Sequence, residues 1–276
     1  MSEVVAEAPV KPKTSGQVQL EVTVRGGVSV ISQQYTHAPL KILRPFRLAD
    51  GTLLVQLLSV GPGMLERDHY DISVHVNSGA KLLLINQAAS KVLTMSPNTC
   101  ATQTVRLSVA AEGCLEYYPG TTLPYPGAAL RQTIDVHTET GATFGMVETW
   151  ARGRVARGEV DAFQTLENHT CIYQAGKPLY RDALYLTPQR AHAWGVLEGY
   201  YYVSSGYWLG DWGMLEPVNE QQDSLMVARG TDAHSNTYLR ALAHDNVTLK
   251  KALTEQLQVL RQSRTDVPWD VYSSAL

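Results

Sequence analysis

The chain has 276 residues, of which 44% are hydrophobic and 18% charged, and its formal net charge is −3. This length and composition suit one large domain or two ordinary ones with a substantial core. They exclude a nucleic-acid-binding protein, which needs a basic stripe, and a helical membrane protein, which needs roughly 20 consecutive apolar residues.

The first 16 residues contain early acidic residues and two late prolines, and they lack the basic start and apolar run of a signal peptide. Three widely spaced cysteines, Cys100, Cys114 and Cys171, form no CxxC pair and argue against a disulfide framework. We therefore expect a disordered tail over residues 1–16, a single domain over residues 17–276, and a cytoplasmic location.

From Gln17 onward, apolar and polar residues alternate with a period of two, which predicts β-strands. The stretches that show this pattern are QVQLEVTV, YDISVHVN, TVRLSV and LRQTIDV, and turn residues such as Gly, Pro and Asn separate them. In LRQTIDV, Gln132 shares the face of Leu130 and Ile134. The sequence therefore predicts a long series of short strands.

One stretch of this series, LLLINQAASKVLTM over residues 82–95, begins like a core strand and then turns polar at Asn86 and Gln87. Lys91 follows before the apolar residues resume. Either the strand reaches the surface there, or these polar groups line something inside the protein.

A weak internal repeat joins several of the predicted strands. In each copy an alternating strand ends in Val, a short turn reaches Gly, and a second strand follows; the turn glycines are Gly79, Gly113 and Gly141, with Gly176 a looser fourth. Copies about 30 residues apart indicate stacked strand pairs, as in a solenoid-like or layered β structure. Periodicity alone fits ordinary hairpins in a sandwich equally well.

The C-terminal part changes character after an aromatic-rich segment, residues 194–212, to which we assign no role. A helical segment is expected at about residues 235–264, where Leu249, Leu253, Leu257 and Leu260 form one apolar stripe. Asn246 is a candidate cap for its start, and Pro268 lies just past its end. Such a stripe usually packs on the protein's own sheet, and contact with a partner is the less common alternative.

Motifs for chemistry are sparse. The eight histidines form no HxH or HxxxH pair, and no nucleophile elbow or phosphate-binding loop is present. Carboxylates do lie in or beside apolar strands: Asp68, Asp71, Glu116, Glu148, Glu159 and Asp182. Two of them at a suitable separation would serve glycoside hydrolysis. The default interpretation is paired structural charges, with Arg154 and Arg157 close to Glu159 in sequence.

Six motifs in order, over roughly residues 18–190, resemble the urease accessory protein UreD (UreH) family. They are LLSVGPGMLERDHYDISVHVNSGA, INQAASKV, ATQTVRLSV, CLEYYPGTTLPYPGA, GATFGMVETWARGRVARGE and GKPLYRDALYL. The chain departs from the family pattern at Arg67, where Gly usually precedes the turn Asp, and at Asn86 and Ser90, where Thr is usual.

The resemblance implies a mainly β protein: a long two-layer, solenoid-like stack of short strands with helices near the C-terminus. It also implies a non-enzymatic maturation chaperone that forms a complex with accessory protein F and the GTPase accessory protein G on apo-urease. In the family, nickel is inserted into the urease active site and a passage through this subunit is a proposed route. No cofactor would be bound tightly, and Ni²⁺ would only be in transit.

A passage would explain the polar strand ends, because a wet interior supplies hydrogen-bond partners. We expect Gln87 and Lys91, four residues apart, to face it together with Gln103. The carboxylates would add weak oxygen ligands. The full set of interior or passage candidates is Asp68, Gln87, Lys91, Gln103, Glu116, Glu148, Arg154, Glu159 and Asp182. The alternative role of each is a bond that locks the layers together.

Two other functions stay open at this point. One is an intracellular carbohydrate-active β-solenoid enzyme that uses two of the carboxylates. The other is an interaction scaffold that never contacts metal.

Overall fold

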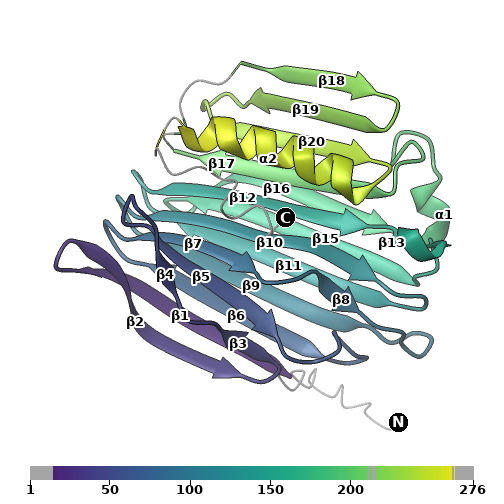
Figure 1. The fold of residues 1–276 in the computed structure, drawn as a ribbon, viewed down its shortest axis with the longest axis horizontal. Helices are drawn as coiled ribbons and strands as arrows, with labels where there is room; N and C mark the ends of the chain where they lie inside the picture. Colours follow the sequence, from purple (N-terminus) through teal and green to yellow (C-terminus); the bar gives the residue numbers. More distant parts are fainter. Residues whose placement is uncertain (1–14, 211, 213–215, 263, 265–276) are drawn as a thin grey trace, which may run out of the picture.

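A computed structural model describes residues 15–210, 212, 216–262 and 264. Within this part the chain forms two large β-sheets that lie face to face, with a long helix on the outside of one of them (Figure 1). The expected mainly β, two-layer and solenoid-like architecture is confirmed. The predicted tail over residues 1–16 lies outside the described residues up to position 14, and Gly16 already begins the first strand.

Sheet A has seven strands, and its two edges are β2 and β16. In spatial order the strands are β16 (Lys177–Leu186), β15 (Thr165–Gln174), β11 (Ala129–Thr138), β9 (Ala101–Val109), β6 (His69–Val76), β1 (Gly16–Arg25) and β2 (Val28–His37).

Sheet B has eleven strands, nine of them in one continuous path. The path runs β18 (Val218–Gln222), β19 (Leu225–Thr231), β20 (Thr237–Ala243), β17 (Tyr202–Leu209), β12 (Thr143–Ala151), β10 (Cys114–Pro124), β7 (Lys81–Asn86), β5 (Leu53–Ser59) and β3 (Leu40–Ile42). Two short strands lie beside it: β4 (Phe46–Arg47) on β5, and β8 (Ser90–Val92) on β10.

Successive strands of the repeat belong to opposite sheets. β6, β9, β11 and β15 are parallel neighbours in sheet A, and β5, β7, β10 and β12 are parallel neighbours in sheet B. The turns that cross between the sheets contain Gly79, Gly113 and Gly141, so the stacked alternative is confirmed and the hairpin alternative fails for these turns. Gly176 differs, because it sits between the antiparallel strands β15 and β16.

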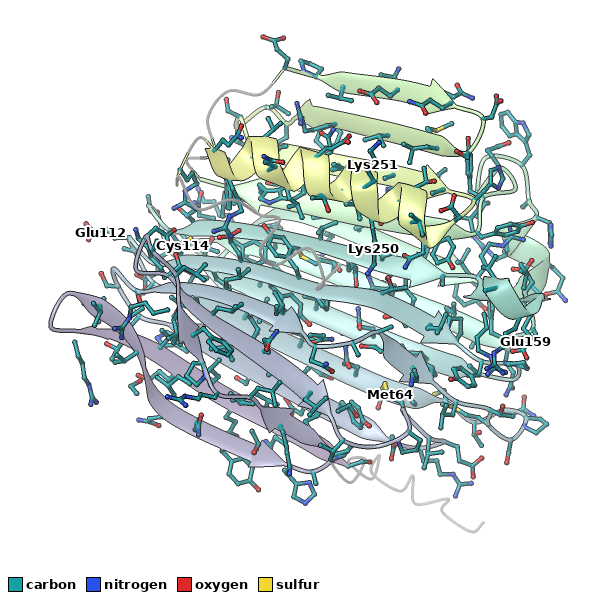
Figure 2. The ribbon with its side chains drawn as sticks, in the orientation of Figure 1. Met64, Glu112, Cys114, Glu159, Lys250 and Lys251 are labelled. Atoms are coloured by element: carbon teal, nitrogen blue, oxygen red, sulfur yellow. The ribbon has the colours of Figure 1, made fainter. Side chains whose placement is uncertain are left out.

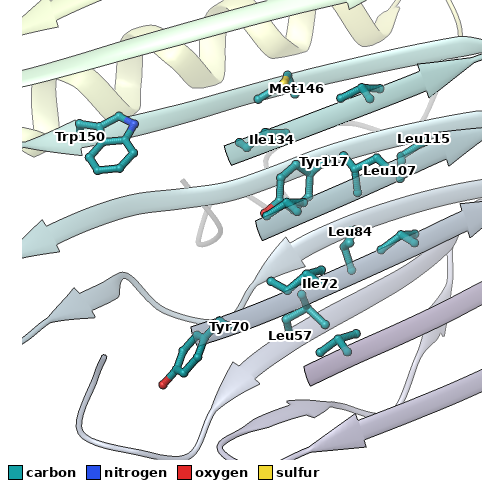
Figure 3. Close-up of a cluster of buried hydrophobic side chains, with 14 of the residues drawn as sticks. Leu57, Tyr70, Ile72, Leu84, Leu107, Leu115, Tyr117, Ile134, Met146 and Trp150 are labelled. Atoms are coloured by element: carbon teal, nitrogen blue, oxygen red, sulfur yellow. The ribbon is translucent and has the colours of Figure 1, made fainter. Parts of the chain in front are cut away.

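The main core lies between the two sheets. Alternate residues of each strand point into it, among them Ile72, Leu107 and Ile134 from sheet A and Leu84 and Leu115 from sheet B (Figure 3). These side chains are at most 4% exposed. The alternation seen in the sequence therefore gives sheet A one buried face and one face in water.

The outer face of sheet B carries a second core, which is covered by α2 (Asn246–Gln262). The leucine stripe packs here as expected, with Leu249, Leu253, Leu257 and Leu260 at most 2% exposed. Asp245, not Asn246, caps the helix: its Oδ1 accepts a hydrogen bond from the Thr248 backbone N–H at 2.8 Å.

The predicted start of this helix at about residue 235 is wrong. Residues 237–243 form β20 instead, between β17 and β19. Their sequence, TYLRALA, alternates in burial, with Leu239 and Ala241 buried and Tyr238 and Arg240 exposed, so the period is two rather than 3.6. Pro268, expected just past the helix, lies outside the described residues.

The aromatic-rich segment 194–212 supplies β17, the strand that joins the parallel part of sheet B to its antiparallel end. Trp208 is 1% exposed and its Nε1 donates to the Tyr118 hydroxyl at 3.3 Å, so it helps to fill the second core.

The remaining elements are short: β13 (Gly153–Arg154), η1 (Val155–Arg157) and β14 (Glu159–Val160) form one protrusion, and α1 (Pro188–Ala191) follows β16. No helix in the described ranges is long and apolar enough to cross a membrane.

Candidate functional site

Polar side chains cross the main core at the level of β11, β12 and β15. Gln132, Glu148, Asn168 and Thr170 are 2–4% exposed and occupy positions where the period of two places core residues. In β12, for example, Glu148 follows the inward-facing Met146. These four side chains, with Gln103 of β9, are called the polar line below.

Hydrogen bonds connect the polar line continuously. Gln103 Nε2 donates to Gln132 Oε1 at 2.7 Å, and Gln132 Nε2 donates to Glu148 Oε2 at 2.8 Å and to Asn168 Oδ1 at 3.0 Å. Asn168 Nδ2 donates to Glu148 Oε1 at 2.6 Å, and the Thr170 hydroxyl lies 3.5 Å from the same oxygen. Each buried amide is thereby satisfied, as a stable interior requires.

Glu148 is the only ionisable member of the polar line, and among the described residues no Lys, Arg or His nitrogen lies within 4 Å of it. Burial and, to a smaller extent, the charge of Asp182 raise the pKa of its carboxyl to about 7, against the opposing effect of the hydrogen bonds from Asn168 and Gln132. Glu148 can therefore hold or release a proton near neutral pH.

The polar line joins the walls of two cavities. Gln103 lines the larger one, of about 110 Å³, together with Tyr70, Lys91 and Met64. Figure 2 labels Met64. Glu148 and Thr170 line a much smaller one of about 10 Å³, together with their respective cross-strand neighbours Ser205 and Asp182. The smaller volume is about what one water molecule requires. Hydrogen-bonded side chains thus connect the walls of these two hollows across an otherwise apolar core.

Of the predicted interior residues, Gln103 and Glu148 lie in the polar line, and Asp182 lines the small cavity. Asp182 also accepts a hydrogen bond from Arg240 Nη2 at 2.8 Å, which ties the edge of sheet A to β20. The structure thus brings together three of the predicted residues.

The expectation that Gln87 and Lys91 both face the interior is wrong, because both are exposed. It assumed one regular strand through both residues, but β7 ends at Asn86 and β8 begins only at Ser90. The intervening residues leave the sheet, and the parity of the strand is lost. Lys91 does line the larger cavity, from its outer side.

Glu116 lies in a different layer from the polar line. It projects from β10 to the outer side of sheet B, where both its oxygens accept from Arg261 Nη1 of α2 at 2.8 Å. Burial raises the pKa of Glu116, and the Arg261 charge opposes that rise. The side chains are 7% and 1% exposed, so this ion pair ties α2 to the sheet rather than lining the interior.

Asp68, Arg154 and Glu159 are also outside the polar line. Asp68 Oδ2 accepts from the Leu65 N–H at 2.8 Å and closes a turn. Arg154 and Glu159 form a two-pronged ion pair, at 2.6 and 2.7 Å, within the β13–β14 protrusion at one end of the molecule (Figure 2). Arg154 also stacks on Tyr125, 4.0 Å from the ring centre. Their contacts are those expected of paired structural charges.

Three members of the polar line were not among the predicted site residues: Gln132, Asn168 and Thr170. A signal for Gln132 is present in the sequence, because it shares the face of Leu130 and Ile134. Asn168 and Thr170 likewise alternate with Leu166 in LENHT. An uncharged polar residue in the apolar register of a strand is therefore the pattern that marks the line. Among the residues in the described ranges, no three His, Cys, Asp or Glu side chains are grouped so that they could hold a metal ion.

Comparison with known proteins identifies the family. A family model described as UreD urease accessory protein matches residues 14–271. The chain belongs to the UreD family. The match extends well past residue 190, through β17–β20 and α2, so these elements are part of the family fold and not an addition to it.

Curated relatives agree with the family model. The chain is 40% identical over 235 residues to urease accessory protein UreD 1 of Synechococcus sp. (strain JA-3-3Ab), covering 84% of this chain and 86% of that protein. It is 33% identical over 264 residues to urease accessory protein UreD of Deinococcus radiodurans, covering 95% and 92%. A UreD protein of Nostoc sp. (strain PCC 7120) is 33% identical over 199 residues, 71% of each chain.

The family position before Asp68 can now be explained. Arg67 has a φ of 62°, in the left-handed region that favours glycine, and its N–H donates to the Cys100 carbonyl at 3.0 Å. A positive φ at this turn fits the Gly that the resemblance led us to expect there, and in this chain Arg67 adopts that conformation.

Proposed function

We propose that this UreD-family protein is a non-catalytic maturation factor that delivers nickel to apo-urease in a complex with accessory proteins F and G. The observation that carries the proposal is the family match over residues 14–271. Two relatives named urease accessory proteins also align with this chain over most of their length. Nickel is here the cargo of the protein and not a resident cofactor.

The polar line supports a route for this cargo. A divalent cation that passes through a protein needs oxygen ligands along its way, and the amide and carboxylate oxygens of Gln103, Gln132, Asn168 and Glu148 supply them. These are weak ligands for Ni²⁺ compared with imidazole or thiolate, so an ion would not be trapped.

The first experiment removes the gene from a host that carries the urease structural and accessory genes. Urease activity, soluble urease protein and bound nickel are then measured with and without it. Normal amounts of urease protein with little nickel or activity, restored when the gene is returned, would support the maturation role. Full activity without the gene would refute it.

A second experiment separates nickel delivery from assembly. Glu148→Gln alters the polar line, and Glu167→Gln is its matched control on the outer face of β15, where Glu167 pairs with Arg131 at 2.8 Å. We expect Glu148→Gln to lower the nickel content of urease while F, G and urease still co-purify with the protein, and Glu167→Gln to leave both unchanged. Equal nickel content of urease with both variants would show that the polar line is not part of the nickel route.

A further inference from the structure

β2 forms an open edge of sheet A (Figure 1). It pairs only with β1, and residues 28–37 make no other backbone–backbone hydrogen bond to any residue within the described ranges. Residues 33–37 are all exposed. The free N–H and C=O groups along such an edge are a template for another strand.

The other sheet edges carry the features that usually prevent strand addition. β16 contains Lys177, Pro178, Arg181 and Asp182, while β18 has only five residues, including Glu220, and β3 has only three. In contrast, β2 has ten residues, VSVISQQYTH, with no Asp, Glu, Lys, Arg or Pro. Among the described edge strands, β2 is thus the one that neither charged residues, nor proline, nor short length protects against pairing with another strand.

The regular part of this edge is short and well defined. A bulge opposite Glu21 and Val22 leaves Ser32 unpaired, and Pro39 follows the strand on the other side. Between them lie residues 33–37, with Tyr35 in the middle. Tyr35 is 50% exposed on the outer face of sheet A, where it pairs with Gln19 of β1.

We propose that β2 pairs antiparallel with β2 of a second copy of this chain, with Tyr35 opposite Tyr35 across a two-fold axis. This arrangement joins the two seven-stranded sheets edge to edge. It places Gln34 opposite Thr36 and Gln33 opposite His37, so every cross-strand pair is polar or aromatic and none brings like charges together. The interface is isologous, as in most two-fold dimers.

The absence of charge favours a second copy as the occupant. Two-fold pairing sets each strand against its own sequence, so a charged residue near the axis would meet its identical counterpart. In β16, an axis through Arg181 or through Asp182 would set that charge against itself, whereas β2 has no Asp, Glu, Lys or Arg at any position. Because only five residues on each side are free, we expect a weak, reversible dimer rather than an obligate one.

The test is sedimentation velocity of the full chain over a wide concentration range, with Tyr35→Lys, Tyr35→Glu and an equimolar mixture of the two. The wild type should pass from monomer to dimer as concentration rises. Each single variant should raise the dissociation constant by about tenfold or more, because like charges then face each other across the axis. The mixture should dimerise again, a recovery that misfolding of either variant would prevent.

The matched control is Tyr185 on β16, the opposite edge of the same sheet, which is 46% exposed. Tyr185→Lys and Tyr185→Glu should leave dimerisation as in the wild type. A wild type that stays monomeric at every concentration would refute the proposal, even if β2 accepts a strand from another protein. A dimer unaffected by the Tyr35 variants, or a mixture that stays monomeric, would refute it as well.

Discussion

Glu148→Gln should remove a specific pH dependence from the stability of the fold. Glu148 is 4% exposed, and its oxygens accept hydrogen bonds from Gln132 and Asn168 rather than from a cation. Burial therefore raises its pKa from 4.5 to about 7. Glutamine has the shape of the protonated carboxyl but cannot ionise, so the variant fixes the neutral state while its amide neighbours reorient to accept the new N–H group.

The sign and size of the effect follow from linkage. Because the pKa is higher in the folded than in the unfolded state, the folded state binds more protons between these values, and raising the pH destabilises it. The stability that the protonated Glu148 carboxyl contributes is fully present below pH 4.5 and is lost as the pH rises through about 7. With these pKa values, ionisation of Glu148 should cost about 1 kcal/mol of unfolding free energy between about pH 6 and pH 8.

Urea denaturation at a series of pH values between about 6 and 8 measures this quantity. The difference in unfolding free energy between Glu148→Gln and the wild type should move by about 1 kcal/mol in favour of the variant as the pH rises. Glu167→Gln is the control: Arg131 lowers the pKa of Glu167, so its titration lies well below this range and the wild-type slope should remain. Equal slopes for Glu148→Gln and the wild type would refute the assignment of a neutral-range pKa to Glu148.

Three further predictions concern the layers and the turn around the site. Arg261→Met leaves Glu116 buried without its counter-charge and should lower the unfolding free energy, measured by urea denaturation, by about 3–5 kcal/mol. The double variant Glu116→Leu/Arg261→Met should recover most of that loss. A double variant as unstable as the single one would contradict the ion-pair argument. Leu253→Ala, at a side chain 2% exposed under α2, should cost about 2–5 kcal/mol, and a loss below about 1 kcal/mol would mean that the helix does not cover the sheet in solution. At Arg67, Gly should stay within about 1 kcal/mol of the wild type while Val, which resists a φ of 62°, should lose about 1–2 kcal/mol; equal thermal melting of the two variants would refute the turn conformation.

Local periodicity predicts the strands well, and a change of period is where it fails. The alternation in QVQLEVTV and TVRLSV corresponds to β1 and β9 because one face of each strand is buried. The helix expected over about residues 235–264 includes TYLRALA, although the leucine stripe that predicts it begins only at Leu249. In the structure TYLRALA pairs with β19, its hairpin neighbour, and with the more distant β17, and these two ladders decide that it is a strand.

The candidate site was only partly predictable for a related reason. Gln103 and Glu148 stand in strands that continue regularly, so their inward direction follows from parity. Gln87 and Lys91 do not, because the chain leaves the sheet after Asn86 and parity is lost across the break. Which amides then meet depends on the register between parallel strands, such as Gln103 beside Gln132 and Gln132 beside Asn168, and one sequence does not contain that register.

The same reasoning explains why α2 covers sheet B and leaves the outer face of sheet A bare. β11 alternates between buried and exposed residues, so only its inner face is apolar. In β7, by contrast, Leu82, Leu83, Leu84 and Ile85 are all buried, and β12 has eight consecutive buried residues from Phe144 to Ala151. A run of apolar residues without alternation needs cover on both sides. The apolar residues of LLLINQ therefore belong to a strand that is buried on both faces. The polar residues that follow begin at Asn86, where the strand ends beside the larger cavity and is no longer covered on both sides.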